Sequence, residues 1–225
     1  MKHSLLARIF YGFAALLVLS AFAFKIIQPI KVLPRIRLAP AFSLTDQNGE
    51  RVTNEDLRGK IVLYNFTYTT CPAPCANLDS TMQDVYARLD EANLGDIPFV
   101  RVTVSFDPAR DAPSTLKSYA DALSANRETW AFATTDDEAL LKAIVGAGFK
   151  AYYEKKDDGS YAFDPTFILV DGWGTIRGEY RYSTEISNVD RILRHLSVLG
   201  DEVTNATGSA KLAYEAARLF LCYAK

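Results

Sequence analysis

Apolar runs of strand length alternate along the chain with segments whose apolar residues have helical spacing. Residues 61–66 and 99–106 are two mostly apolar runs, as expected for strands covered on both faces of a sheet. The residues from 74 to 91 follow the first run and have the spacing of an amphipathic helix. Its apolar side carries Leu78, Met82, Val85 and Leu89. Asp79 is expected on the polar side of that helix.

The second half of the chain continues this alternation. The predicted elements are a helix from 113 to 123, a short strand at 130–132, a helix at 136–145, strands at 163–171 and 175–182, and a helix at 185–199. The last two strands are joined through Gly172-Trp173-Gly174, which is typical of a hairpin. This order predicts an α/β domain, with a mixed sheet flanked by helices, over residues 41–200.

The N-terminal residues 1–27 read as a membrane anchor or a signal segment. Residues 9–24 carry no charge and lie between Arg8 and Lys25. A spanning helix needs about 20 apolar residues, so this segment is short unless the flanking cations reach the membrane interfaces. Ala21-Phe22-Ala23 fits a signal cleavage site, but the length of the apolar run favours a retained transmembrane helix.

Positive charge ahead of the apolar segment predicts the orientation of the chain. Lys2 and Arg8 precede the segment, which favours an N-terminus inside and a domain on the periplasmic or extracytoplasmic side. Residues 28–40 contain three prolines and are expected to form an extended linker. Residues 201–225 are expected to form a C-terminal helical extension.

Composition and charge narrow the classes of function. The formal net charge is -2 and the pI is about 5.8, so no basic surface is expected to hold nucleic acid. The chain has 3 cysteines, too few for a disulfide scaffold. Two of them, Cys71 and Cys75, lie four positions apart, a spacing that suits a redox pair or a soft-metal site.

The cysteine pair lies where a predicted strand leads into a helix. In Cys71-Pro72-Ala73-Pro74-Cys75 the prolines cost little, because the first N–H groups of a helix have no partner within it. The positive end of the helix dipole favours a thiolate, which is both a nucleophile and a soft-metal ligand. Two buried structural cysteines are the alternative, but they would not need an exposed turn rich in proline.

Pro165-Thr166, at the entry to the strand that follows, is a second candidate feature. In thioredoxin-like folds a loop of this kind, with a cis proline before an apolar strand and a D-x-x-G turn, faces the cysteine turn. The stretch from Pro165 to Gly174 is similar. We therefore predict a thioredoxin-like fold in which Pro165 faces Cys71 and Cys75. An ordinary trans proline at the start of a strand is the alternative.

Two motifs resemble those of the Sco (synthesis of cytochrome c oxidase) family of membrane-anchored copper-handling proteins. The stretch from Phe66 to Cys75, FTYTTCPAPC, matches the family pattern F-x-[FY]-T-x-C-P-x-x-C. The stretch from Asp107 to Pro113, DPARDAP, matches the pattern D-P-x-R-D-x-P. The resemblance covers about residues 39–200.

The resemblance implies a metallochaperone that binds copper through Cys71 and Cys75. It would deliver copper, or electrons, to the dinuclear copper site of a terminal oxidase subunit. The third family ligand is a histidine in a D-H pair, and here the matching pair is Asp164-Pro165. The chain has 2 histidines: His3 precedes the apolar segment, and His195 is expected to pack in or on the last domain helix. Two thiolates favour Cu(I) over Cu(II), and Cys222 is a conceivable third sulfur.

Other functions remain open from the sequence. A thiol-disulfide oxidoreductase without a copper role, acting on another thiol protein, is the main alternative, and it is the only enzymatic activity that the residues suggest. A thiol peroxidase is disfavoured, because Tyr68 stands where similar peroxidases carry threonine. A non-catalytic binding module would not need the cysteines at all.

Overall fold

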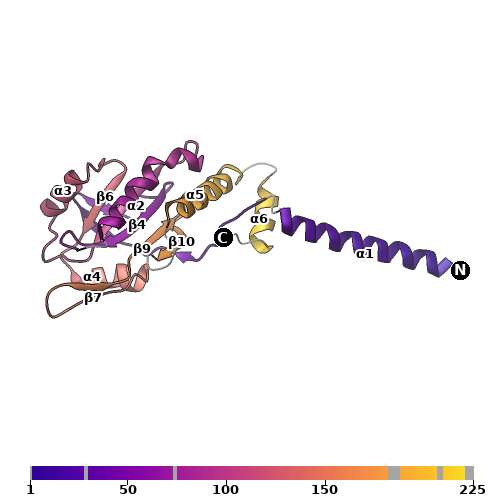
Figure 1. Cartoon of the computed structure of the whole chain (residues 1–225), viewed down its shortest axis with the longest axis horizontal. Helices are drawn as coiled ribbons and strands as arrows, with labels where there is room; N and C mark the ends of the chain where they lie inside the picture. The colour runs from indigo at the N-terminus through magenta and orange to yellow at the C-terminus, as the bar shows by residue number, and fades with distance from the viewer. Residues whose placement is uncertain (1, 28–29, 73–74, 182–187, 207–209, 221–225) are drawn as a thin grey trace.

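The computed structural model describes the chain except for residues 1, 28–29, 73–74, 182–187, 207–209 and 221–225 (Figure 1). The side chains of residues 2–5, 21, 24–27, 75–76 and 218–220 are also outside the description. Cys222 and the side chains of Cys75 and His3 therefore lie outside the described part of the protein.

The order of helices and strands follows the predicted alternation. The helices are α1 (Lys2–Ile27), α2 (Cys75–Ala87), η1 (Leu89–Ala92), α3 (Pro113–Ala122), α4 (Glu138–Leu141), η2 (Lys142–Gly148), α5 (Val189–Thr204) and α6 (Lys211–Phe220), where η1 is a 3-10 helix and η2 a π-helix. The strands are β1 (Arg37–Leu38), β2 (Ser43–Asp46), β3 (Arg51–Thr53), β4 (Ile61–Thr67), β5 (Phe99–Ser105), β6 (Trp130–Thr134), β7 (Tyr153–Lys155), β8 (Tyr161–Phe163), β9 (Thr166–Val170) and β10 (Thr175–Arg181).

An 8-stranded mixed sheet, in the order β1-β10-β9-β4-β5-β6-β2-β3, forms the centre of the domain. β4, β5 and β6 run parallel, whereas β9 and β10 extend the sheet antiparallel to β4. All seven residues of β4 are buried, because helices or loops cover both faces of this central strand. The predicted mixed α/β sheet is confirmed.

Two hydrophobic cores lie on opposite faces of the sheet, and alternate residues of β4 divide between them. Ile61 and Leu63 pack with residues of α2, α3 and α5, whereas Val62 and Tyr64 pack with residues of α4 and η2. In Figure 1, α2 and α5 lie on one side of the strands and α4 on the other. Because successive side chains of β4 point to opposite faces of the sheet, α2, α3 and α5 pack on one face, and α4 and η2 pack on the other.

The structure differs from the predicted strand at 163–171. Tyr161–Phe163 belongs instead to a separate two-stranded hairpin of β7 and β8, and the sheet strand β9 begins at Thr166. Asp164 and Pro165 separate the two, because proline has no N–H to continue a ladder. The hairpin packs through its aromatic residues on Phe106, at the end of β5.

Part of the predicted linker packs on the domain. Val32 and Leu33 are 0% and 2% exposed, and β1 adds an antiparallel strand beside β10. Arg177 donates hydrogen bonds to the backbone carbonyls of Leu33 (2.8 Å) and Pro34 (3.1 Å). The prolines and basic residues of this segment are typical of an extended linker, so the packing of Val32 and Leu33 on the domain was not predicted.

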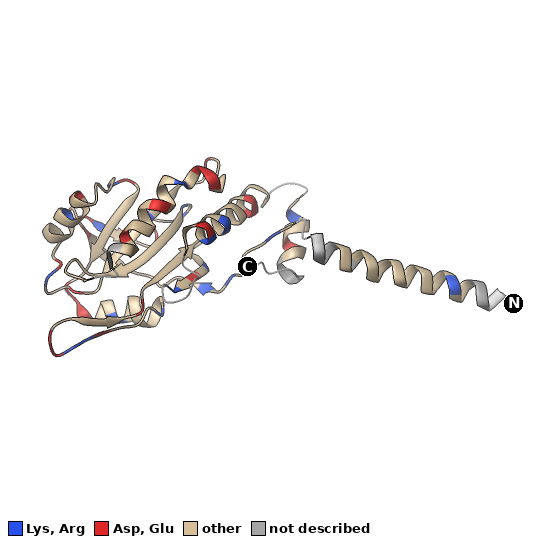
Figure 2. Cartoon of the chain, in the orientation of Figure 1, with Lys and Arg blue, Asp and Glu red and all other residues tan. Residues whose placement is uncertain are grey.

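Helix α1 stands apart from the folded domain (Figure 1). Among the residues of α1 whose side chains are described, Arg8 is the one charged residue, and Figure 2 draws nearly all of that stretch in the colour of uncharged residues. Among the described residues, however, no helix has both the length and the apolar character needed to cross a membrane, so the predicted transmembrane helix is not confirmed.

Candidate functional site

The cysteine turn joins the end of β4 to the start of α2, as the sequence predicts. The Cys71 N–H donates a hydrogen bond of 3.1 Å to the carbonyl oxygen of Tyr68 and closes the turn after the strand. Cys71 is half-buried and packs against both hydrophobic cores. Its sulfur therefore lies at the edge of the sheet, where a partner can reach it.

Cys71 is disulfide-bonded in this structure. Its Sγ lies 3.3 Å from the carbonyl oxygen of Pro72, which can accept a hydrogen bond from the thiol after reduction. Cys75 is the first residue of α2, and the first turn of that helix contains no acidic residue. The unopposed positive end of the helix favours thiolate in the reduced protein.

Asp111, in the loop that follows β5, is hydrogen-bonded to the chain just before the cysteine turn. Its buried carboxylate accepts hydrogen bonds from the N–H and hydroxyl of Thr69 (2.9 and 2.5 Å) and from the hydroxyl of Ser105 (2.5 Å). Thr69 is two residues before Cys71. The aspartate of the D-P-x-R-D-x-P motif thus fixes the chain that carries the first cysteine, a role that the sequence alone did not reveal.

Asp107, the first residue of the same motif, connects this loop to the β7–β8 hairpin. Its carboxylate pairs with Arg110 and accepts a hydrogen bond of 3.2 Å from the Tyr161 hydroxyl. Arg110 also donates to the carbonyl oxygen of Gly159, 2.6 Å away. These contacts hold the hairpin beside the loop that supports the cysteine turn.

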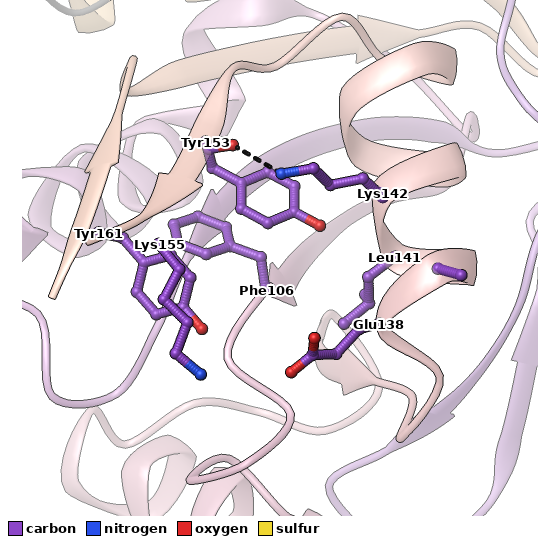
Figure 3. Close-up of a pocket in the computed structure, with 8 residues that line it drawn as sticks. Phe106, Glu138, Leu141, Lys142, Tyr153, Lys155 and Tyr161 are labelled. Atoms are coloured by element: carbon purple, nitrogen blue, oxygen red, sulfur yellow. Dashed lines mark hydrogen bonds between the residues drawn. The ribbon is translucent and has the colours of Figure 1, made fainter. Parts of the chain in front are cut away.

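An aromatic cluster lies beneath the turn. The Tyr68 ring is 5.5 Å from Phe106 and 5.1 Å from Tyr161, between ring centroids. The far side of this cluster borders a cavity of about 380 Å³ between the hairpin and α4. In Figure 3, Lys142 points across the cavity to the carbonyl oxygen of Tyr153. The cluster shields one side of the turn from water.

Pro165 lies at the same edge of the sheet as the cysteine turn. β9 pairs antiparallel with β4, and Phe167 is opposite Asn65, so the start of β9 meets the end of β4. Asp164, in the position of the family's D-H pair, forms an ion pair with Arg181. The predicted contact of Pro165 with the cysteines stays a prediction.

His195 is a buried residue of α5. Its Nδ1 is 2.8 Å from the hydroxyl of Tyr180, and the side chain is 7% exposed. Among the side chains that the structure describes, no group of three or more His, Cys, Asp or Glu could hold a metal ion. Cys71 and Cys75, the second of which has its side chain outside the description, stay the predicted metal ligands.

Asp79 is buried, contrary to its predicted place on the polar side of the helix. The reason is that α3 covers this part of α2, and the Tyr119 hydroxyl donates a hydrogen bond to Asp79 Oδ2. Burial raises the pKa of Asp79 to about 6, although the Tyr119 hydrogen bond lowers it. Nothing in the helical spacing indicates this burial, because it depends on a tyrosine forty residues away.

Comparisons with known proteins agree with the sequence motifs. The SCO1/SenC family model matches residues 32–197. An SCO2-like protein of Rickettsia typhi is 31% identical over 166 residues, which cover 71% of this chain and 78% of the relative. Solved structures of this group also share the thioredoxin-like fold, as predicted.

Two of the related solved structures are of proteins linked to copper or to cytochrome c oxidase. ScoI of Bradyrhizobium japonicum, with copper bound, is 25% identical, has a TM-score of 0.56, and covers 73% of this chain and 98% of its own. BsSco, described as a member of the Sco family of cytochrome c oxidase assembly proteins, is 24% identical with a TM-score of 0.64. The match covers 76% of this chain and 98% of BsSco.

Proposed function

Because the chain belongs to the SCO1/SenC family, we propose that it is a Sco-type cytochrome c oxidase assembly factor. It binds copper, exchanges thiol and disulfide, or does both, through Cys71 and Cys75, and so matures the dinuclear copper site of an oxidase subunit. The observation that supports this proposal most directly is the position of the cysteine turn at the edge of the sheet, where hydrogen bonds between Thr69 and Asp111 hold it.

The redox state of Cys71 supports a working pair. Its disulfide partner lies among the side chains outside the description, and Cys75 is the neighbour four residues away at the start of α2. We infer that Cys71 and Cys75 form this disulfide. A disulfide has no thiolate, so copper binding requires the reduced pair.

The donor set fits Cu(I) as cargo. Two thiolates are soft ligands of the kind that Cu(I) prefers, and copper binding would release their protons. Pro165 replaces the histidine that the family resemblance implies, and it offers no side-chain donor. Cu(II), which prefers imidazole, would be bound less well. This departure also favours the second candidate function, thiol-disulfide exchange without copper.

In that exchange, Cys71, which is half-buried at the edge of the sheet, is the candidate nucleophile. Its thiolate attacks one sulfur of a partner's disulfide, the S–S bond of the partner breaks, and the other partner sulfur leaves as a thiolate. The Cys75 thiol then loses its proton to solvent and attacks Cys71 Sγ, which releases the second partner thiolate and forms the Cys71–Cys75 disulfide. The pair loses two electrons and the partner disulfide gains them.

A Cu(I) titration of reduced and oxidised protein tests the copper proposal. We expect the reduced chain to bind one Cu(I) in competition with a chromophoric chelator, and the oxidised chain to bind none. Weak binding that is the same in both redox states would contradict a copper role. It would leave thiol-disulfide exchange, which is then measured as turnover with a disulfide-bonded partner peptide.

We further propose that residues 1–27 hold the domain at the extracytoplasmic face of a membrane. Large apolar side chains of α1 are more than half exposed, among them Phe10, Leu16 and Phe22 at 67%, 63% and 63%. Exposed apolar surface of this extent is typical of a contact with lipid or protein.

Membrane fractionation tests this location. The full chain is expected to stay with membranes after alkaline carbonate washing and to be released by detergent, whereas the Leu16→Lys, Leu17→Lys variant is released by carbonate. Labelling of the reduced cysteines in intact cells by a membrane-impermeant maleimide checks on which side of the membrane the domain lies. Recovery of the wild-type chain in the soluble fraction would contradict the proposal.

A further inference from the structure

The cavity between the β7–β8 hairpin and α4 has no part in the proposed function so far. It measures about 380 Å³, and its floor is formed by the buried side chains of Phe106, Leu141 and Tyr161. The Phe106 ring stacks on Tyr153 at 4.7 Å and meets Tyr161 edge to face at 5.2 Å, between ring centroids. A hollow of this size, with aromatic walls and few polar groups, is typical of a binding site.

Two charges of opposite sign lie at the mouth of this cavity. Lys155 comes from β7 and Glu138 from α4, and in Figure 3 their charged groups point into the mouth from opposite walls. Both side chains are exposed, and within the described part of the chain neither forms an ion pair. Lys142 is already engaged, because its ammonium donates to the carbonyl oxygen of Tyr153 and lies 4.8 Å from the centre of the Tyr153 ring. The rim therefore offers Lys155 to an anion and Glu138 to a cation.

The cavity lies close to Cys71. Tyr161 lines it, and the ring of Tyr161 is 5.1 Å from the ring of Tyr68. Tyr68 is joined to Cys71 by the hydrogen bond that closes the cysteine turn, and the ends of such a turn are less than about 7 Å apart. Cys71 is therefore roughly 12 Å from the cavity wall, a distance that three or four residues of extended chain span.

These features fit a side chain of a partner polypeptide. A polypeptide that meets Cys71 brings its neighbouring residues within this reach, so one of its side chains is presented to the cavity at a high effective concentration. An aromatic side chain suits the floor, because edge-to-face contacts with Phe106 and Tyr161 add to the burial of its apolar area. The residues on either side of it remain at the rim, where the two charges lie.

We propose that the cavity is a specificity pocket for the partner polypeptide. It binds an aromatic side chain three or four residues from the partner cysteine that meets Cys71, with an acidic neighbour facing Lys155 and a basic neighbour facing Glu138. The proposal deepens the proposed function and rests on it in taking Cys71 as the group that the partner reaches. Segments that lack the aromatic residue are held less tightly, so the protein selects among the thiols and disulfides that it meets.

Thiol exchange with model peptides tests this pocket. The probe is a blocked hexapeptide, Cys-Gly-Gly-Asp-Phe-Lys, whose cysteine is joined in a disulfide to thionitrobenzoate. The Cys71 thiolate attacks the peptide sulfur, the S–S bond breaks, and thionitrobenzoate leaves as a coloured thiolate. With the reduced full chain we expect this probe to react about tenfold faster than its analogue with alanine in place of phenylalanine, because the buried ring holds the peptide sulfur at Cys71. The rate of the Cys71→Ser chain is subtracted as the background of the other cysteines.

Variants of the cavity wall separate the pocket from other effects. Ala139→Phe, at an exposed position that lines the cavity, fills it and is expected to remove the tenfold preference. Lys155→Gln is expected to reduce the preference about threefold. Lys156→Gln makes the same change at the next residue, which does not line the cavity, and is expected to have no effect. A probe with phenylalanine directly after its cysteine cannot reach the cavity and is expected to match the alanine analogue.

Equal rates for the phenylalanine and alanine probes with the wild-type chain would overturn the proposal. A tenfold preference that survives in Ala139→Phe would also overturn it, because the ring would then bind elsewhere. If Ala139→Phe does not fold, an unchanged preference in Lys155→Gln serves as the contrary result.

Saturation-transfer NMR distinguishes a failure of the pocket from a failure of the proposed function. The cysteine-free peptide Gly-Gly-Asp-Phe-Lys, blocked at both ends, reports binding of the ring without copper or thiol chemistry. If the Cu(I) titration and the exchange both fail while Ala139→Phe abolishes an observed transfer to the ring, the proposed function falls and the pocket is supported. Transfer to free phenylalanine that is as strong as transfer to the peptide would overturn a partner polypeptide as the occupant.

Discussion

Replacement of Cys71 by serine is expected to lower the affinity of the reduced protein for Cu(I) by on the order of a thousandfold. The proposed donor set contains two thiolates, and a hydroxyl is a hard, neutral donor that Cu(I) does not favour. Structural zinc sites gain about 10–16 kcal/mol from four ligands, or about 2.5–4 kcal/mol for each, and the upper end of that range corresponds to about a thousandfold loss. A competitive titration with a chromophoric Cu(I) chelator measures it.

The matched control is Cys222→Ser. Cys222 lies outside the described residues and is a conceivable third sulfur, so its replacement separates a two-thiolate site from a three-thiolate site. We expect its affinity to equal that of the wild type. If Cys71→Ser binds as tightly as wild type, copper is not held by the predicted pair; a large loss in Cys222→Ser would place a third thiolate in the site.

Replacement of Arg177 by methionine is expected to lower the free energy of unfolding by about 3–5 kcal/mol. The Arg177 side chain is 0% exposed and forms ion pairs of 3.0 Å with Asp171 and 2.6 Å with Glu202. Methionine fills much of the volume but leaves two buried carboxylates without their shared cation. Urea denaturation at pH 7 measures the loss.

Arg127→Met is the control for this variant. Arg127 is 65% exposed and lies 3.9 Å from Glu50, and a surface pair of this kind contributes little. A loss below about 1 kcal/mol in Arg177→Met would show that the buried cluster relaxes or admits water once the arginine is gone.

The central strands and the cysteine turn could be predicted because their signals are local. Residues 61–66 form a mostly apolar run, and Cys71 and Cys75 follow it within a proline-rich turn. Strand, turn and helix adjoin in sequence, so periodicity and turn chemistry suffice to place them. The family motifs added the expected fold, which the related structures confirm.

The supporting residues could not be predicted, because their environment is made by distant parts of the chain. Asp111 reaches Thr69 across forty-two positions, and Asp79 is buried by Tyr119 from another helix. Charged residues usually lie at the surface, so a buried carboxylate has no signature in a single sequence. The aspartates of D-P-x-R-D-x-P were recognisable as a motif, but their contacts were not.

The docking of Leu33 limits how far the cysteines can travel. Glu202 accepts a hydrogen bond from the Leu33 N–H, and Arg177 donates to its carbonyl oxygen, so the domain is fixed to the chain from about residue 32. If α1, which ends at Ile27, is held at a membrane, residues 28–31 allow a reach of at most about 14 Å. A linker this short raises the effective concentration of Cys71 near partners in the same membrane. It also excludes partners that do not approach that membrane surface.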